Sequence, residues 1–125
     1  MNKLRFAVLG CGFWSKFQIG AWSELEGAEL VAVYNRTLSK AKITAEYFRV
    51  PKVYDNPEEL FKNETIDFVD IITDVDTHAL FVEMAVRHGI RNIICQKPMA
   101  PDFETAKRMV KACREAGVKL YIHEN

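Results

Sequence analysis

The sequence lacks several features that would place the chain in a special class. No apolar run approaches the roughly 20 residues that a membrane-spanning helix needs. The 17 basic residues balance 17 acidic ones, and no basic block stands out, so nucleic acid is not expected as the main partner. Residues 1–3 lead directly into an apolar run, which predicts no signal peptide.

Cysteine is also scarce. Cys11, Cys95 and Cys113 are odd in number and lie far apart in the sequence. They show no C-x-x-C spacing, which makes both a zinc site and a disulfide framework unexpected. We therefore predict no bound metal and a reduced, cytoplasmic environment.

What the sequence does contain is a regular alternation of apolar runs and helical patterns. Strands are expected at residues 4–9, 29–34, 53–54, 66–72, 91–95 and 119–123, and helices at 13–25, 38–48, from 57 onward, at 77–88 and at 103–116. Short connections between alternating strands and helices predict an α/β fold with a doubly wound parallel sheet, the Rossmann fold, in a single domain. Right-handed crossovers then give the strand order 3-2-1-4-5-6.

Two helices carry clear boundary signals. Asn56 is expected as an N-cap, with Pro57 at the first helical position. Asp102 is expected to cap the last helix, and Gly117 to end it. Helical spacing predicts one apolar stripe on that last helix, made of Phe103, Ala106, Met109, Val110 and Cys113.

The most informative stretch is the turn after the first apolar run. Gly10 and Gly12 stand one residue apart between a predicted strand and a predicted helix. The first N–H groups of such a helix lack partners and favour a phosphate. Gly10 would permit the tight turn, and Gly12 would let the backbone approach a pyrophosphate. For these glycines alone, a turn without any ligand remains an alternative.

Three further residues extend this candidate phosphate site. The backbone N–H groups of Phe13 and Trp14 are expected to face the pyrophosphate, while their side chains either line the cleft or pack. Ser15 stands where the motif G-x-G-x-x-G has its third glycine. Serine is small enough to allow close helix–strand packing, and its hydroxyl is equally able to donate to the pyrophosphate.

Position 35 closes the second predicted strand, where dinucleotide-binding domains carry an acidic residue for the adenosine ribose. This residue is Asn35, followed by Arg36 and Thr37. A carboxylate about 4 Å from a 2′-phosphate would cost roughly 1–4 kcal/mol, which a neutral asparagine avoids. Arg36 offers the phosphate a planar charged fork, and Thr37 and Lys40 are close enough to add donors. We predict NADP(H) as the favoured cofactor, with NAD(H) possible; simple surface charges are the alternative.

The loops after the fourth and fifth predicted strands, Thr73–Asp76 and Gln96–Pro101, share the carboxyl edge of the sheet with the glycine turn. These loops, including Asp74, are therefore further candidate cofactor contacts.

In order and spacing, these motifs resemble the N-terminal domain of the Gfo/Idh/MocA oxidoreductases, over about residues 3–125. The resemblance rests on Gly10-Cys11-Gly12, on Asp70-Ile71-Ile72-Thr73 followed by Thr77-His78, on Gln96-Lys97-Pro98-Met99-Ala100 and on His123-Glu124-Asn125. It implies a nicotinamide-dependent enzyme that acts on a sugar or polyol.

The resemblance also implies roles for single residues. Lys97 would be a catalytic, cofactor-facing lysine that donates to a reacting oxygen, with a pKa lowered by partial burial. Gln96 replaces the family's usual glutamate and is still able to bind a ribose hydroxyl. Thr73 and His78 would lie beside the cofactor, and Asn125 near the nicotinamide.

Members of this family carry a second, α+β domain that supplies the substrate pocket and usually the subunit interface. That domain is not among these 125 residues. We therefore expect this chain alone to bind cofactor with little or no turnover, and the full-length enzyme to be a homo-oligomer. Apolar surface near the last strand and the 98–101 loop is expected to cause self-association.

Two other function classes stay open at this point. One is a non-catalytic NADP-binding module that senses or regulates. The other is a nucleotide- or S-adenosylmethionine-binding domain, although Asn35 lacks the carboxylate that would bind a ribose in such a site. The coding sequence downstream of Asn125 would discriminate the first class from a longer enzyme, and comparing the binding of NADPH, NADH and S-adenosylmethionine would test the second.

Overall fold

The computed structural model describes residues 3–12 and 15–123 of the chain. The structure does not describe Phe13, Trp14 and Asn125, which were predicted to contact the cofactor, nor Glu124.

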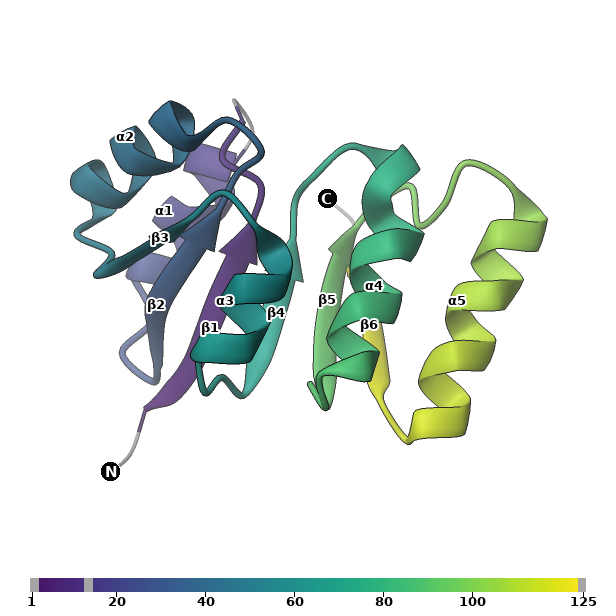
Figure 1. Cartoon of the computed structure of the whole chain (residues 1–125). Coiled ribbons are helices and arrows are strands. Elements are labelled where there is room, and N and C mark those ends of the chain that lie inside the picture. The colour runs from purple at the N-terminus through teal and green to yellow at the C-terminus, as the bar shows by residue number, and fades with distance from the viewer. Residues whose placement is uncertain (1–2, 13–14, 124–125) are drawn as a thin grey trace.

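Strands and helices alternate along the described chain (Figure 1). The strands are β1 (Leu4–Leu9), β2 (Ala28–Tyr34), β3 (Lys52–Tyr54), β4 (Phe68–Ile71), β5 (Asn92–Gln96) and β6 (Lys119–His123). The α-helices are α1 (Ser15–Ser23), α2 (Leu38–Phe48), α3 (Pro57–Asn63), α4 (His78–Arg87) and α5 (Phe103–Ala116), and a 3-10 turn, η1 (Val75–Thr77), precedes α4.

The strands form one parallel sheet in the order β3-β2-β1-β4-β5-β6, which confirms the predicted doubly wound order. The order reverses between β1 and β4, which pair directly. In open sheets of this kind, ligands bind outside the carboxyl ends of the strands at that reversal.

Helices cover the sheet on both faces, with α1 and α2 on one side and α3, α4 and α5 on the other (Figure 1). Successive side chains of β1 enter opposite cores: Phe6 and Val8 pack beneath α1 and α2, whereas Ala7 and Leu9 pack beneath the other helices. All four are at most 1% exposed. The apolar run at residues 6–9 of β1 is therefore buried on both faces, as predicted, whereas Leu4 and Arg5 at the start of the strand are exposed.

The predicted helix boundaries at α3 and α5 are confirmed. Asn56 Oδ1 accepts from the N–H of Glu58 at 2.9 Å, with Pro57 as the first helical residue. Asp102 Oδ1 accepts from the N–H of Thr105 at 2.7 Å, and Gly117 ends α5 with a φ of 71°. Local polar groups thus define where these helices begin and end.

The predicted apolar stripe on α5 is wrong in part. Met109 and Cys113 are buried, but Phe103 is 74% and Val110 39% exposed. Only one face of α5 contacts α4 and the sheet, so the outer apolar residues stay in solvent. The first helix is also shorter than expected, because it ends at Ser23 and leaves Leu25 beyond it.

None of the described helices has both the length and the apolar character that a membrane crossing requires.

Candidate functional site

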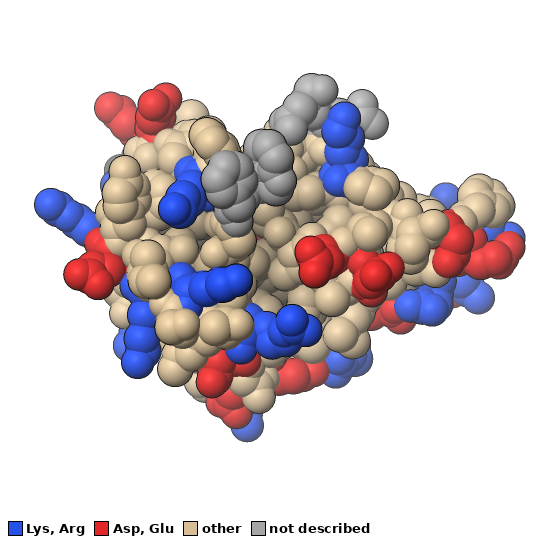
Figure 2. Space-filling model, turned by 90° about the horizontal axis from the view of Figure 1, so that it is seen from above, with Lys and Arg blue, Asp and Glu red and all other residues tan. Residues whose placement is uncertain are grey.

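The carboxyl ends of the parallel strands bring the predicted site segments to one edge of the sheet. Gly10 follows β1, Asn35 follows β2, and the loops at Thr73 and Lys97 follow β4 and β5. Figure 2 shows this edge from above, with several Lys and Arg side chains gathered on the side of β2 and α2. Segments far apart in sequence are thus available to one ligand.

Gly10 lies where the backbones of two strands come close. Its φ is 110°, and a Cβ built on it would lie 2.9 Å from the carbonyl carbon and oxygen of Ile72. Its N–H donates to the carbonyl of Tyr34 at 2.7 Å. Gly10 therefore allows the turn to pass against the end of β4, a position that no other residue type fills without strain.

Gly12 has fewer described neighbours than Gly10. Among residues 3–12 and 15–123, and leaving out its neighbours in the chain, no atom lies within 4 Å of a Cβ built on Gly12. An anionic group is therefore free to approach the backbone here, beside the start of α1. The turn fits the pyrophosphate of a dinucleotide, and this contact stays a prediction.

The surroundings of Ser15 favour the predicted packing role over a contact with the pyrophosphate. The side chain is 1% exposed, and its Oγ donates to the carbonyl of Gly12 at 2.5 Å. Its hydroxyl hydrogen is thus used within the turn, which supports close packing rather than donation to a pyrophosphate.

Asn35 has a structural role that the sequence did not reveal. Its Oδ1 accepts from the N–H of Cys11 at 3.0 Å, and its Nδ2 donates to the carbonyl of Thr37 at 3.1 Å. The amide thus ties the glycine turn to the start of α2. Cys11, beside Asn35, is buried, and this burial raises the pKa of its thiol to about 11. Because the thiolate is the nucleophilic form, Cys11 fits the role of a small packing residue and not that of a nucleophile.

The three residues predicted to recognise a 2′-phosphate lie on the β2–α2 connection and the first turn of α2. Arg36, Thr37 and Lys40 are all exposed. Their side chains are accessible to a ligand, and their contacts with a phosphate stay predictions.

His78 joins two of the candidate loops. It is 1% exposed, with Nε2 2.9 Å from the carbonyl oxygen of Thr73 and Nδ1 3.1 Å from that of Pro98. The ring holds the loops after β4 and β5 together from inside the protein. Thr73 is also hydrogen-bonded through its hydroxyl to that of Thr77, at 2.7 Å, whereas Asp74 is exposed.

A pocket of about 490 Å³ opens between these loops and α1. The pocket is lined by three predicted residues, Thr73, Gln96 and Lys97. It is also lined by Gln18 and His123, which the sequence did not single out for this role. The Lys97 side chain is exposed, so the partial burial expected for it is absent. Its N–H donates to the carbonyl of His123 at 3.3 Å, and the Lys97–Pro98 peptide bond is cis.

A buried carboxylate lies under this pocket. Asp70 is 0% exposed; its Oδ2 accepts from Trp22 Nε1 at 2.8 Å and Gln18 Nε2 at 3.0 Å, and its Oδ1 from Gln96 Nε2 at 3.3 Å. Burial raises the pKa of the Asp70 carboxyl, while these three donors and the nearby His123 oppose the rise. The signal in the sequence was a charged residue inside an otherwise apolar strand, since a buried charge needs partners.

The candidate residues therefore fall into two groups in the structure. Gly10, Gly12 and Asn35 surround the first turn, and Thr73, Gln96 and Lys97 line the pocket beside it. Arg36 and Lys40 lie outside that pocket. Among residues 3–12 and 15–123, no three His, Cys, Asp or Glu side chains come together where a metal ion could bind.

A family model described as the oxidoreductase family, NAD-binding Rossmann fold, matches residues 4–124. Among characterised proteins, the chain is 38% identical over 125 residues to D-apiose dehydrogenase of Rhizobium rhizogenes and 36% identical to that of Paraburkholderia graminis. These matches cover all of this chain but 36% and 33% of the two relatives, so the chain spans about a third of their length.

Solved structures show the same fold. An oxidoreductase from Agrobacterium radiobacter, in complex with NAD+, L-tartaric acid and magnesium, superposes with a TM-score of 0.94 at 37% identity. The WlbA dehydrogenase from Bordetella pertussis, in complex with NADH and UDP-GlcNAcA, superposes with a TM-score of 0.90 at 30% identity. Both matches cover 98% of this chain, and 36% and 37% of those chains.

Proposed function

The chain belongs to the Gfo/Idh/MocA oxidoreductase family, and we propose that it is the cofactor-binding domain of a longer dehydrogenase. That enzyme would transfer hydride between a nicotinamide cofactor and a sugar or polyol. The observation that carries the proposal is the pocket containing Lys97, which opens at the carboxyl edge of the sheet beside the glycine turn. No observation favours a non-catalytic sensor over this function.

Each part of the edge has a task in the proposed reaction. The turn at Gly10 and Gly12 would bind the pyrophosphate, because its open side admits an anion next to the start of α1. The nicotinamide, when bound, accepts or supplies the hydride. Lys97, exposed in the pocket, would donate a hydrogen bond to the reacting oxygen of the substrate.

The names and bound ligands of the relatives support a proposal for the substrate class. Two of them are named D-apiose dehydrogenase, and WlbA was solved with a nucleotide sugar, UDP-GlcNAcA. We propose a sugar or polyol as the substrate of the complete enzyme, and a homo-oligomer as its assembly. A further α+β domain would hold the substrate within about 3–3.5 Å of the nicotinamide, so this chain alone should show little or no turnover.

We further propose that NADP(H) binds better than NAD(H). Position 35 carries no carboxylate to repel a 2′-phosphate, and Asn35 uses its amide within the turn. Arg36 and Lys40 are exposed next to it and carry the charge that a phosphate needs. The two neighbouring structures described above contain NAD+ and NADH, so direct comparison of the cofactors is the decisive measurement.

The test is titration of the chain with NADPH and NADH, followed by fluorescence or calorimetry. We expect NADPH to bind more tightly, and the variant Arg36→Ala to lose about 1.5–3 kcal/mol for NADPH, as for a hydrogen bond to a charged group, with little change for NADH. Lys42→Ala, an exposed lysine on α2, is the matched control and should leave both affinities unchanged.

Equal affinities, or a preference for NADH, would refute the NADP preference while leaving dinucleotide binding intact. Failure to bind either cofactor, with S-adenosylmethionine bound instead, would refute the proposed function.

A further inference from the structure

A chain of hydrogen bonds runs from Asp70 in the protein core to His123 at the end of β6. Gln96 Nε2 donates to Asp70 Oδ1 at 3.3 Å, and Nδ1 of His123 lies 2.8 Å from Gln96 Oε1. Asp70 is 0% exposed, whereas His123 is partly exposed on the wall of the pocket that contains Lys97. The buried Asp70 carboxylate is thus linked by hydrogen bonds to His123, a side chain that a ligand in this pocket would contact.

Asp70 determines the direction of each hydrogen bond in this chain. Trp22 and Gln18 both donate to Oδ2, and when the Asp70 carboxylate is ionised both of its oxygens only accept hydrogen bonds. Gln96 must therefore turn its amide N–H₂ toward Asp70 and its Oε1 toward His123. Because an amide oxygen also only accepts, Nδ1 of His123 must carry a hydrogen, and in the neutral ring Nε2 holds a lone pair.

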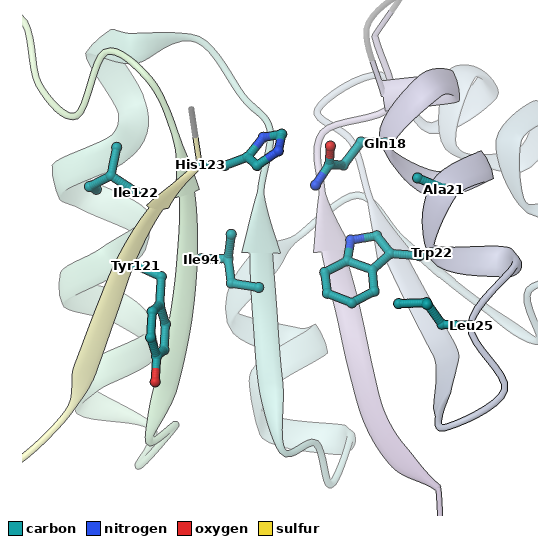
Figure 3. Close-up of a pocket in the computed structure, with 8 residues that line it drawn as sticks. All are labelled: Gln18, Ala21, Trp22, Leu25, Ile94, Tyr121, Ile122 and His123. Atoms are coloured by element: carbon teal, nitrogen blue, oxygen red, sulfur yellow. The ribbon is translucent and has the colours of Figure 1, made fainter. Parts of the chain in front are cut away.

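The second ring nitrogen of His123 is available. No residue within 3–12 and 15–123 forms a hydrogen bond with Nε2. Figure 3 shows the ring reaching from the end of β6 toward Gln18 on α1. Both side chains also line the Lys97 pocket, where a bound molecule would meet this nitrogen.

We propose that Asp70, acting through Gln96, holds His123 as its Nδ1–H tautomer, so that Nε2 accepts a hydrogen bond from the carboxamide N–H₂ of the nicotinamide. The inference rests on the proposed function. With the pyrophosphate at the β1 turn and the adenosine toward β2, the nicotinamide end lies over β4, β5 and β6, where this pocket opens. Asp70 and Gln96 are positioning residues, and His123 contacts the cofactor.

The variant Asp70→Asn tests the tautomer directly. Its single amide oxygen would remain with Trp22 and Gln18, which leaves an N–H₂ group facing Gln96. Gln96 must then turn over and present its own N–H₂ to His123, so Nδ1 becomes the acceptor and Nε2 gains the hydrogen. Asp70→Asn preserves the shape of the side chain at position 70. It nevertheless converts Nε2 of His123 from an acceptor into a donor.

The measurement is long-range ¹H–¹⁵N NMR of the imidazoles at about pH 8.5, where an ordinary histidine with a pKa of about 6.5 is neutral. His123→Gln identifies the signal. We expect Nδ1–H in the natural chain, Nε2–H in Asp70→Asn and a mixture in Gln96→Leu. Asp67→Asn, the same change at an exposed carboxylate just before β4, is the control and should leave the signal unchanged.

Nε2–H in the natural chain, or Nδ1–H in a folded Asp70→Asn variant, would overturn the proposed tautomer. Should Asp70→Asn not fold, the natural chain and Gln96→Leu decide the same point.

The ligand is tested with NAD+ and its 3-acetylpyridine analogue, which has a carbonyl but no N–H₂. We expect the natural chain to prefer NAD+, and Asp70→Asn to reduce that preference by about three- to tenfold, the value of one hydrogen bond. An unchanged preference would overturn the carboxamide contact. If the natural chain bound neither dinucleotide, the proposed function would fail together with this contact, whereas the tautomer would still be decided by the NMR measurement.

Discussion

Gly10 and Gly12 are one residue apart, but the structure gives them different surroundings. Gly10 has a positive φ and lies against the backbone of Ile72, whereas no described residue beyond its chain neighbours comes within 4 Å of a Cβ built on Gly12. One glycine is therefore required by the fold and the other is available for a ligand. The spacing of the two in the sequence does not reveal this difference.

Alanine substitutions should separate the two roles. Gly10→Ala places a Cβ 2.9 Å from the Ile72 carbonyl group in a strained backbone, and should cost roughly 1–3 kcal/mol of stability from strain alone. Gly12→Ala should change stability by no more than about 0.5 kcal/mol, yet weaken NAD(P)H binding by about tenfold or more. Chemical denaturation and cofactor titration of both variants check this.

The reverse pattern, an unstable Gly12→Ala or a Gly10→Ala variant with natural stability, would contradict these assignments.

At the scale of secondary-structure elements, Glu58 links α3 to the end of α4. Its Oε2 lies 2.6 Å from Nε2 of His88, and its Oε1 lies 3.0 Å from Nη2 of Arg87. The hydrogen bond from His88, then that from Arg87, lower the pKa of the Glu58 carboxyl below its ordinary 4.5. A lowered pKa in the folded state means that ionised Glu58 stabilises the fold.

The variant Glu58→Gln should therefore unfold at a lower temperature than the natural chain at neutral pH. The stabilisation is present above pH 4.5, the ordinary pKa, and is lost as the pH falls through the lower folded-state pKa. The difference between the two proteins should shrink across that acid range. Thermal unfolding from pH 7 to pH 3 measures it, with Glu46→Gln, an exposed glutamate on α2, as the control.

A difference in stability that is independent of pH would show that the Glu58 contacts act through packing and not through charge.

At the scale of the whole molecule, an apolar groove lies between α1 and β6. Two adjoining pockets of about 580 and 550 Å³ share Trp22, Leu25, Ile94 and Tyr121 along this groove (Figure 3). Leu25 and Tyr121 are 53% and 51% exposed. Exposed apolar surface of this kind favours association, because burying it releases water.

We expect the chain to self-associate through this groove as its concentration rises. Leu25→Lys combined with Tyr121→Lys should raise the concentration required by at least about tenfold, which corresponds to about 1.4 kcal/mol. Tyr47→Lys, at a 79% exposed tyrosine on α2, should have no such effect. Light scattering over a concentration series measures the mass, and a monomer at millimolar concentration would contradict the expectation.

The sequence by itself determined the order of the elements and hence the sheet. Apolar runs, the caps at Asn56 and Asp102 and the glycine after α5 are local signals, and short right-handed connections leave few topologies. The same order placed the glycine turn and the loops at Thr73 and Lys97 on one edge. A resemblance of motifs then predicted the family, which the comparisons confirmed.

Only the tertiary structure decided which side chains meet. Asp70 bonds Gln18, 52 positions away, and Gln96, 26 positions away, while Asn35 reaches back to Cys11. The exposure of Lys97 and the burial of His78 were decided in the same way. These features depend on side-chain directions and on what packs against each residue, which are set by contacts between distant segments. Local periodicity and capping signals carry no record of such contacts.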